Sequence, residues 1–186
     1  HLRERIREGH VAQWQFVLGD FTRQHRGGIE PQFHVDRQLI STDPLGETPQ
    51  AAGAREARIV AARAGHLREA MLGEVPPSAL APGPGRAEVL AVVEDMARVM
   101  GADQFQMQSR AMQRRPDHQK TLRRTLLPAL IVAGAFDTVI PPRRQEFTAD
   151  LMPKARFLKI DQAGHLPTLE APEVVSDAME DFLNEP

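Results

Sequence analysis

The stretch ALIVAGAFD, residues 129–137, decides the fold predicted for this chain of 186 residues. Its first six residues are continuously apolar and partly β-branched, as in a parallel strand covered on both faces. PPRRQEFTADLM (141–152) then predicts a helix that opens with proline, RFLKI (156–160) a second strand, and APEVVSDAMEDFL (171–183) a terminal helix. This alternation predicts an α/β fold with a parallel sheet. The residues of the last helix expected to face inward are Val174, Val175, Ala178, Met179 and Phe182.

Residues 51–117 are expected to be helical. One amphipathic helix is predicted over residues 54–72, and after the loop PPSALAPGPG (76–85) a second helix ends at Gly101, before a further helix from about Asp103. Their apolar faces comprise Ile59, Val60, Leu67, Met71 and Leu72, then Val89, Leu90, Val93, Met96, Val99 and Met100. A methionine-rich face could adapt to an apolar ligand, but core packing is favoured for Met96, Met100, Met107 and Met112.

Residues 1–37 are polar and rich in arginine and histidine. Short strands are predicted at Phe16–Leu18 and near Leu39–Ile40, and STDPLGETPQ (41–50) has the composition of a loop. The pattern of this region indicates no function.

Composition and charge narrow the function classes. The net charge of −2 gives no reason to expect nucleic acid or an anionic membrane as partner. The absence of cysteine excludes disulfides, thiolate metal sites and a cysteine nucleophile. The longest apolar stretch, Leu126–Phe136, is too short to span a bilayer, and HLRERIREGH at the start is not followed by an apolar segment. Neither a membrane helix nor a signal peptide is predicted, and the expected location is cytoplasmic.

Two polar residues stand just beyond the predicted strands, Asp137 after ALIVAGAF and His165 after RFLKIDQAG. Because the carboxyl ends of parallel strands meet at one edge of a sheet, we expect the two side chains to lie within hydrogen-bonding reach. A carboxylate that accepts from one imidazole nitrogen fixes the tautomer and leaves the other nitrogen free as a general base. Taken singly, an aspartate that caps the following helix and a histidine packed at a strand end would be the simpler interpretations.

The segments GAFDTVIPP (134–142) and AGHLPTLEAPEVVSDAMEDFL (163–183) strongly resemble the end of α/β-hydrolase-fold esterases and lactonases. In that family a G-x-x-D-x-x-x-P loop supplies the acid and a G-H-x-x-x-x-E-x-P loop the histidine. The resemblance therefore implies that Asp137 and His165 belong to a catalytic triad in the order Ser, acid, His. QSRAMQRRPD (108–117) looks like the return helix of the cap in the small esterase and enol-lactonase branch.

The resemblance implies a partial α/β-hydrolase fold in three parts. Residues 1–41 would be a disrupted remnant of the core sheet, residues 42–118 a helical cap, and residues 119–186 the strand-helix-strand-helix end of the core. The N-terminal half of the family's fold would then be missing or disrupted.

The chain departs from the family at the nucleophile, which the family places in a G-x-S-x-G elbow. None of the four serines lies in such a motif: Ser41, Ser78, Ser109 and Ser176. In FVLGDFTRQHRGG (16–28), where the elbow is expected, Phe21 occupies the place of the serine. Asp20 as a nucleophile is a weaker alternative, because it stands one position early and lacks the following glycines. A His-Gly oxyanion loop is also absent from the sequence.

Other polar residues are given structural interpretations. Glu170 is expected to complement the start of the last helix, and Asp161 to lie on the surface. The paired arginines 114–115, 123–124 and 143–144 are expected to be solvated. No metal site is predicted, since the remaining histidines show no ligand spacing: His1, His10, His25, His34, His66 and His118.

The sequence thus predicts a chain whose parent reaction is hydrolysis of a small carboxylic ester or lactone. His165 would transfer the proton and Asp137 would orient His165, with no cofactor and with a small-molecule substrate as partner. Without the serine the chain alone is expected to be inactive. The alternative is a non-catalytic binding module that self-associates through an exposed sheet edge.

Overall fold

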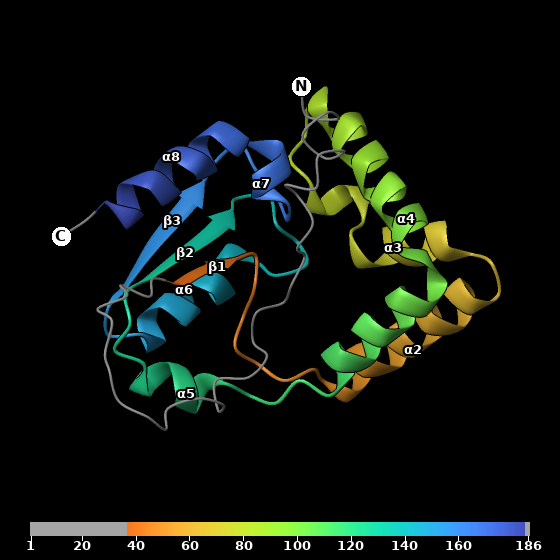
Figure 1. The fold of residues 1–186 in the computed structure, drawn as a ribbon, viewed down its shortest axis with the longest axis horizontal. Coiled ribbons are helices and arrows are strands. Elements are labelled where there is room, and N and C mark those ends of the chain that lie inside the picture. Colours follow the sequence, from red (N-terminus) through yellow and green to blue (C-terminus); the bar gives the residue numbers. More distant parts are fainter. Residues whose placement is uncertain (1–36, 185–186) are drawn as a thin grey trace, which may run out of the picture. The chain divides into compact units, whose positions relative to one another are not determined.

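A computed structural model describes residues 37–184, and these form a three-stranded parallel sheet in the order β1-β2-β3 (Figure 1). The strands are β1, Arg37–Ile40, β2, Ala129–Gly134, and β3, Ala155–Ile160. The register pairs Ile40 with Val132 and Gly134 with Ile160. The parallel α/β sheet predicted from the sequence is therefore confirmed, whereas the strand predicted at Phe16–Leu18 lies outside the described residues.

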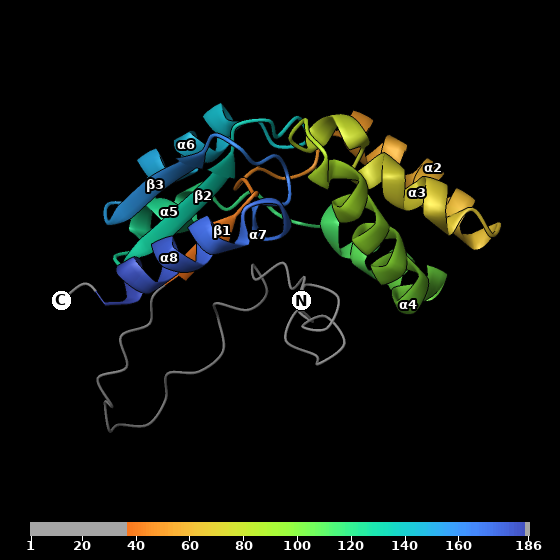
Figure 2. The ribbon, with the colours of Figure 1, turned by 90° about the horizontal axis from the view of Figure 1, so that it is seen from above.

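Helices cover both faces of the central strand β2, whose six residues are all buried. Leu130 and Val132 pack with Val175 and Phe182 of α8, Pro172–Leu183. On the opposite face, Ala129 and Ile131 pack with α5, Gln119–Arg124, and with the end of α6, Pro142–Leu151 (Figure 2). The continuous apolar run of β2 is explained by this burial on two sides, because alternate side chains of a strand point to opposite faces.

The terminal helix differs in detail from its prediction. Val175 and Phe182 are buried, and Ala178 and Met179 pack against the same cluster. Val174, expected to face inward, is 37% exposed because it lies toward the solvent side of the helix. A short helix that the sequence did not predict, α7, Pro167–Glu170, precedes α8.

Residues 49–113, here called the helical segment, contain α2, Pro49–Arg63, α3, Leu67–Glu74, the 3₁₀ turn η1, Pro77–Ala79, and α4, Gly85–Gln113. Its core comprises Ile59, Ala62, Ala70 and Phe105. The prediction of one helix over residues 54–72 is wrong. The chain turns between α2 and α3 at Gly65, where φ is +94°, a conformation that glycine adopts readily. Val60, placed on the apolar face by the pattern, is 60% exposed.

The predicted interruption at Gly101 is confirmed, since this residue has φ 77° and ψ 167° within α4 and kinks the helix. The apolar stripe predicted on α4 is only partly buried. Val99 is 80% exposed, whereas Met100 packs against the core of the helical segment. The core packing favoured for Met107 is wrong, since this residue is 65% exposed. Within residues 37–184, no helix combines the length and apolar character required to cross a membrane.

Candidate active site

Asp137 occupies the turn that follows β2, with its side chain fully buried. Its backbone amide donates to Gly134 O at 3.1 Å. The carboxylate oxygen Oδ1 accepts from the backbone amides of Val139 and Ile140, each at 2.9 Å. These bonds form because the chain reverses over Thr138–Pro141, bringing two amides toward the carboxylate. They leave the second oxygen, Oδ2, to face the neighbouring loop.

His165 lies in the loop after β3, and its Nδ1 is 3.0 Å from Asp137 Oδ2. The structure thus brings together the two side chains that the strand order predicts to be neighbours. With the carboxylate ionised, Nδ1 carries the proton and donates it, which leaves a lone pair on Nε2. No hydrogen bond joins Nε2 to another described residue, and the side chain is 15% exposed. The pair can therefore orient a general base toward a reacting group.

Two glycines allow the loops to meet. A Cβ on Gly134 would lie 2.0 Å from Gly164 O, and a Cβ on Gly164 would lie 2.2 Å from Ala79 O. Side chains at either position would collide with backbone atoms. The backbone amide of His165 donates to Ala79 O at 2.7 Å, so the histidine loop is fixed against η1 of the helical segment.

Gln145 of α6 also contacts the pair. Its Nε2 donates to Asp137 Oδ2 at 3.0 Å and to Ile140 O at 2.7 Å. Sequence reasoning missed this residue, because a glutamine on a polar helix carries no local sign that it will be buried.

Glu170 has a different place from the one predicted. It is the last residue of α7, where its Oε1 accepts from Leu166 N at 2.9 Å and its Oε2 from Ala81 N at 2.6 Å. The carboxylate therefore joins the histidine loop to the helical segment instead of complementing the start of α8. Asp161 lies on the surface, as predicted, with its side chain 82% exposed.

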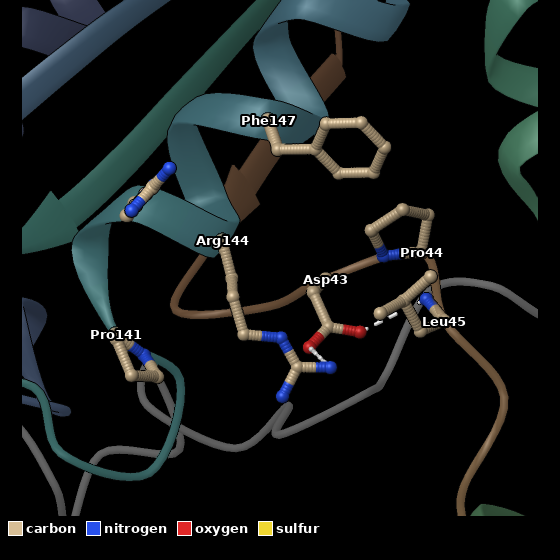
Figure 3. A pocket seen from close by; sticks show the side chains of 7 residues that line it. Asp43, Pro44, Leu45, Pro141, Arg144 and Phe147 are labelled. Atoms are coloured by element: carbon tan, nitrogen blue, oxygen red, sulfur yellow. Dashed lines mark hydrogen bonds and ion pairs between the residues drawn. The ribbon is translucent and has the colours of Figure 1, made fainter.

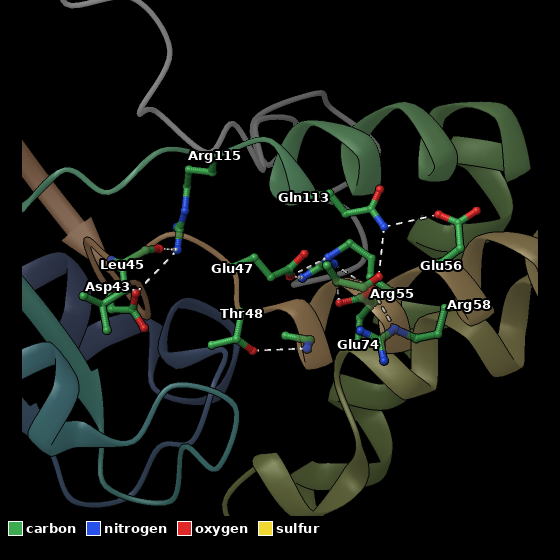
Figure 4. A network of polar contacts seen from close by, with 12 residues as sticks. Asp43, Leu45, Glu47, Thr48, Arg55, Glu56, Arg58, Glu74, Gln113 and Arg115 are labelled. Atoms are coloured by element: carbon green, nitrogen blue, oxygen red, sulfur yellow. Dashed lines mark hydrogen bonds and ion pairs between the residues drawn. The ribbon is translucent and has the colours of Figure 1, made fainter.

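A buried carboxylate, Asp43, lies in the loop after β1 and pairs with two arginines, Arg144 (Figure 3) and Arg115 (Figure 4). Arg115 Nη2 lies 3.4 Å from Oδ1, and Arg144 Nη2 lies 2.9 Å from Oδ2. Arg115 also donates to Leu45 O at 2.6 Å. Burial lowers the pKa of Arg115, against the opposing influence of Asp43. The prediction that the paired arginines are solvated is wrong for Arg115, whose side chain is 13% exposed, whereas Arg144 pairs with the carboxylate from an exposed position.

A second ionic network lies at the start of the helical segment, where Arg55 contacts Glu47 and Glu74 (Figure 4). Arg58 Nε also donates to Glu74 at 2.8 Å. Burial lowers the pKa of Arg55, but the two glutamates outweigh burial and raise it overall. The network is structural, since each of these charges has a partner of opposite sign.

The described residues line a pocket of about 370 Å³ next to Asp43, bounded by Pro44, Leu45, Pro141, Arg144 and Phe147 among others (Figure 3). Neither Asp137 nor His165 lines it. We place the candidate active site at the Asp137–His165 pair and not at this pocket. A general base requires a histidine oriented by a carboxylate, and neither residue of the pair lines the pocket. Among residues 37–184 no group of three or more histidine or acidic side chains is arranged to hold a metal ion.

Comparison with known proteins supports the fold. Residues 98–186 match the family model described as TAP-like protein. An esterase from Thermogutta terrifontis has a TM-score of 0.73 and 26% identity, over 80% of this chain and 55% of that chain. The described residues have part of the α/β-hydrolase fold.

Two further relatives are consistent with this α/β-hydrolase assignment. The enol-lactonase from Burkholderia xenovorans LB400 has a TM-score of 0.69 and 22% identity, over 81% of this chain and 56% of that chain. Epoxide hydrolase EphH from Mycobacterium tuberculosis (strain ATCC 25618 / H37Rv) is 28% identical over 83% of this chain and 68% of its own length. The chain thus spans little more than half the length of the two solved structures.

Proposed function

We propose that this chain supplies the acid and the base of a hydrolase that cleaves a small carboxylic ester or lactone. The observation that carries the proposal is the 3.0 Å contact between His165 Nδ1 and Asp137 Oδ2 at the carboxyl ends of adjacent strands. The names of two similar structures, an esterase and an enol-lactonase, support this substrate class.

In the proposed reaction His165 Nε2 accepts the proton of the attacking hydroxyl group and returns it to the leaving alkoxide. Asp137 holds the ring in the required tautomer and stabilises the imidazolium that forms. The carboxylate suits this role because it is buried, and two backbone amides fix one of its oxygens. The helical segment would act as a cap, since η1 lies directly against the histidine loop.

We further propose that the attacking serine does not come from this chain, because the sequence contains no G-x-S-x-G motif. Ser41 is the serine that most needs testing. It directly follows β1 with a positive φ of 49°, at the sheet edge that also carries Asp137. Its Oγ is buried and has no partner among the described residues, so it is poorly placed to attack a substrate.

The first experiment measures hydrolysis of p-nitrophenyl acetate and butyrate by the purified chain and by its His165→Ala and Ser41→Ala variants. We expect all three to show the same background rate. Turnover that is lost in both variants would contradict the proposal that the chain lacks its own nucleophile.

The second experiment tests the acid and the base directly. A chimera would join residues 37–184 to the part of the Thermogutta esterase that this chain does not cover, with folding checked by circular dichroism. Ester hydrolysis should fall about 10⁴–10⁶-fold in His165→Ala and Asp137→Ala, because the general base or its orientation is lost. Asp161→Ala, an exposed aspartate near the same loop, serves as control. A folded chimera whose activity survives His165→Ala would refute the assignment.

A second candidate function, self-association, is favoured by the sheet order. Among residues 37–184, β1 pairs only with β2, and alternate amides such as that of Gln38 point away from β2. We expect dimers by light scattering if this edge pairs with a second copy, and Gln38→Pro should shift them to monomers by removing an outward donor. A monomeric chain at all concentrations would exclude this candidate.

A further inference from the structure

Asp137 Oδ2, the oxygen that faces His165, has a second donor in Gln145. The Nε2 atom of Gln145 and Nδ1 of His165 each lie 3.0 Å from this oxygen. Gln145 is 0% exposed although it carries a polar side chain on α6. A buried glutamine therefore touches the same atom that orients the histidine.

The contacts determine which way the Gln145 amide points. Nε2 faces two acceptors, Asp137 Oδ2 and Ile140 O, at 3.0 and 2.7 Å. The reversed amide would place Oε1 against a carboxylate and a carbonyl, with no proton between them. The amino group must therefore lie on the side of the carboxylate.

These bonds close a ring around the carboxylate. Ile140 donates its amide to Oδ1 of Asp137, and its carbonyl accepts from Gln145, which in turn donates to Oδ2. One oxygen of Asp137 is thus fixed by backbone amides and the other by Gln145. Rotation of the carboxylate out of this plane would break bonds on both sides.

Gln145 does not achieve this without a cost to stability. Its Oε1 is buried and has no hydrogen-bond partner among residues 37–184. An unsatisfied buried acceptor is unfavourable, and an apolar side chain of the same length would avoid it. The glutamine therefore makes more sense as a group that serves the Asp137–His165 pair than as one that serves packing.

We propose that Gln145 is a positioning residue that holds Asp137 Oδ2 toward the ring of His165. It keeps the imidazole in the Nδ1–H tautomer, with the lone pair of Nε2 available to the reaction. The catalytic meaning of this role rests on the proposed function, whereas the effect on the tautomer does not. Loss of the Gln145 donor leaves Oδ2 with one partner and frees the carboxylate to turn.

The test uses NMR of the full chain with ¹⁵N-labelled histidine, at a pH where the His165 ring is neutral. Gln145→Met has a similar length and no donor, and it should raise the fraction of the Nε2–H tautomer of His165 several-fold. Thr148→Val is the matched control, because Thr148 is 1% exposed on the same helix and donates only to Arg144 O at 3.1 Å. The control should keep the tautomer of the unmodified chain.

An unchanged tautomer in folded Gln145→Met would overturn the proposal, and so would an equal change in Thr148→Val. If Gln145→Met does not fold, Gln145→Leu is measured in the same way. In the chimera with the esterase, Gln145→Met should lower kcat about tenfold and leave KM within twofold. If the chimera is inactive but Gln145→Met still raises the fraction of the Nε2–H tautomer of His165, the proposed function is refuted. The positioning role of Gln145 is then retained.

Discussion

Gly134 ends β2 at the point where the loop of His165 crosses the strand. A Cβ at this position would lie 2.0 Å from Gly164 O and 2.6 Å from Ala163 O, which are backbone atoms that cannot rotate away. We therefore predict that Gly134→Ala lowers the free energy of unfolding by about 3 kcal/mol or more, since overpacking against backbone forces the loop to move. Urea denaturation followed by circular dichroism measures the change.

Gly53 of α2 provides the matched control for this prediction. A Cβ there would have no neighbour within 4 Å. Gly53→Ala should stabilise the chain by about 0.5–1 kcal/mol, because alanine loses less conformational freedom in a helix than glycine does. A similar destabilisation by both alanines would show that the close approach at Gly134 is not the cause.

Asp43 and Arg144 form an ion pair whose members differ in burial, and their substitutions should differ accordingly. Asp43→Ala leaves Arg115, whose side chain is 13% exposed, without its carboxylate partner and should cost about 3–5 kcal/mol. Arg144→Ala removes a side chain that is 47% exposed and should cost at most about 1 kcal/mol. The two free energies of unfolding, compared by urea denaturation, check the prediction. Equal losses would contradict it.

The contact between Asp137 and His165 could be predicted because both residues follow strands, and strand order is a local pattern. The residues that hold them could not be found in this way. Gln145 and Glu170 act through partners on other elements or loops, and their own neighbours in the chain give no sign of these contacts. From sequence alone, a polar residue in a polar helix is predicted to be exposed to solvent, because its tertiary contacts are not known.

At the scale of elements, secondary structure was predicted correctly where a sequence pattern is compatible with only one kind of element. The run of β2 required burial on two faces, and α5, α6 and α8 provide it. It failed where two helices carried a continuous pattern, as across Gly65, because apolar spacing alone does not show that the chain turns. Apolar spacing also does not show which residues are buried, since Val60 and Val99 lie on predicted apolar faces and are exposed to solvent.

The helices α2 and α4 are joined by an ion pair that should respond to pH. Arg110 Nη2 donates to Glu56 Oε1 at 2.8 Å, and Arg110 Nη1 donates to Glu56 Oε2. The hydrogen bonds from Arg110 and Gln113 lower the pKa of Glu56 below its ordinary value of 4.5. The stabilisation is therefore present above about pH 4.5 and is lost as the pH falls through the lowered value.

We predict that in Glu56→Gln the melting temperature depends less on pH below about 4.5 than it does in the unmodified chain. Thermal denaturation between pH 3 and 6 measures this dependence. Arg110→Gln removes the same interaction, so the double variant should behave like either single variant. Additive effects of the two substitutions would mean that the pH dependence arises elsewhere.

At the scale of the whole described region, one backbone hydrogen bond closes the base of the helical segment and another ties the segment to the histidine loop. At its base, His118 N donates to Pro44 O at 2.8 Å, which joins the segments that enter and leave it. At η1, the amide of His165 donates to Ala79 O. The candidate base is therefore positioned jointly by the sheet, through Asp137, and by the helical segment.

Glu170 makes the second bond of this contact, and its loss should loosen the helical segment locally. Because hydrogen bonds to a charged group contribute about 1.5–3 kcal/mol, Glu170→Ala should speed hydrogen exchange of the Ala81 and Leu166 amides about 10–100-fold. Amides of β2 should exchange as before. Glu173→Ala, at an exposed glutamate of α8, is the control. Unchanged exchange at Ala81 would show that the bond from His165 N to Ala79 O is sufficient. Faster exchange throughout β2 would show that Glu170 stabilises the sheet itself.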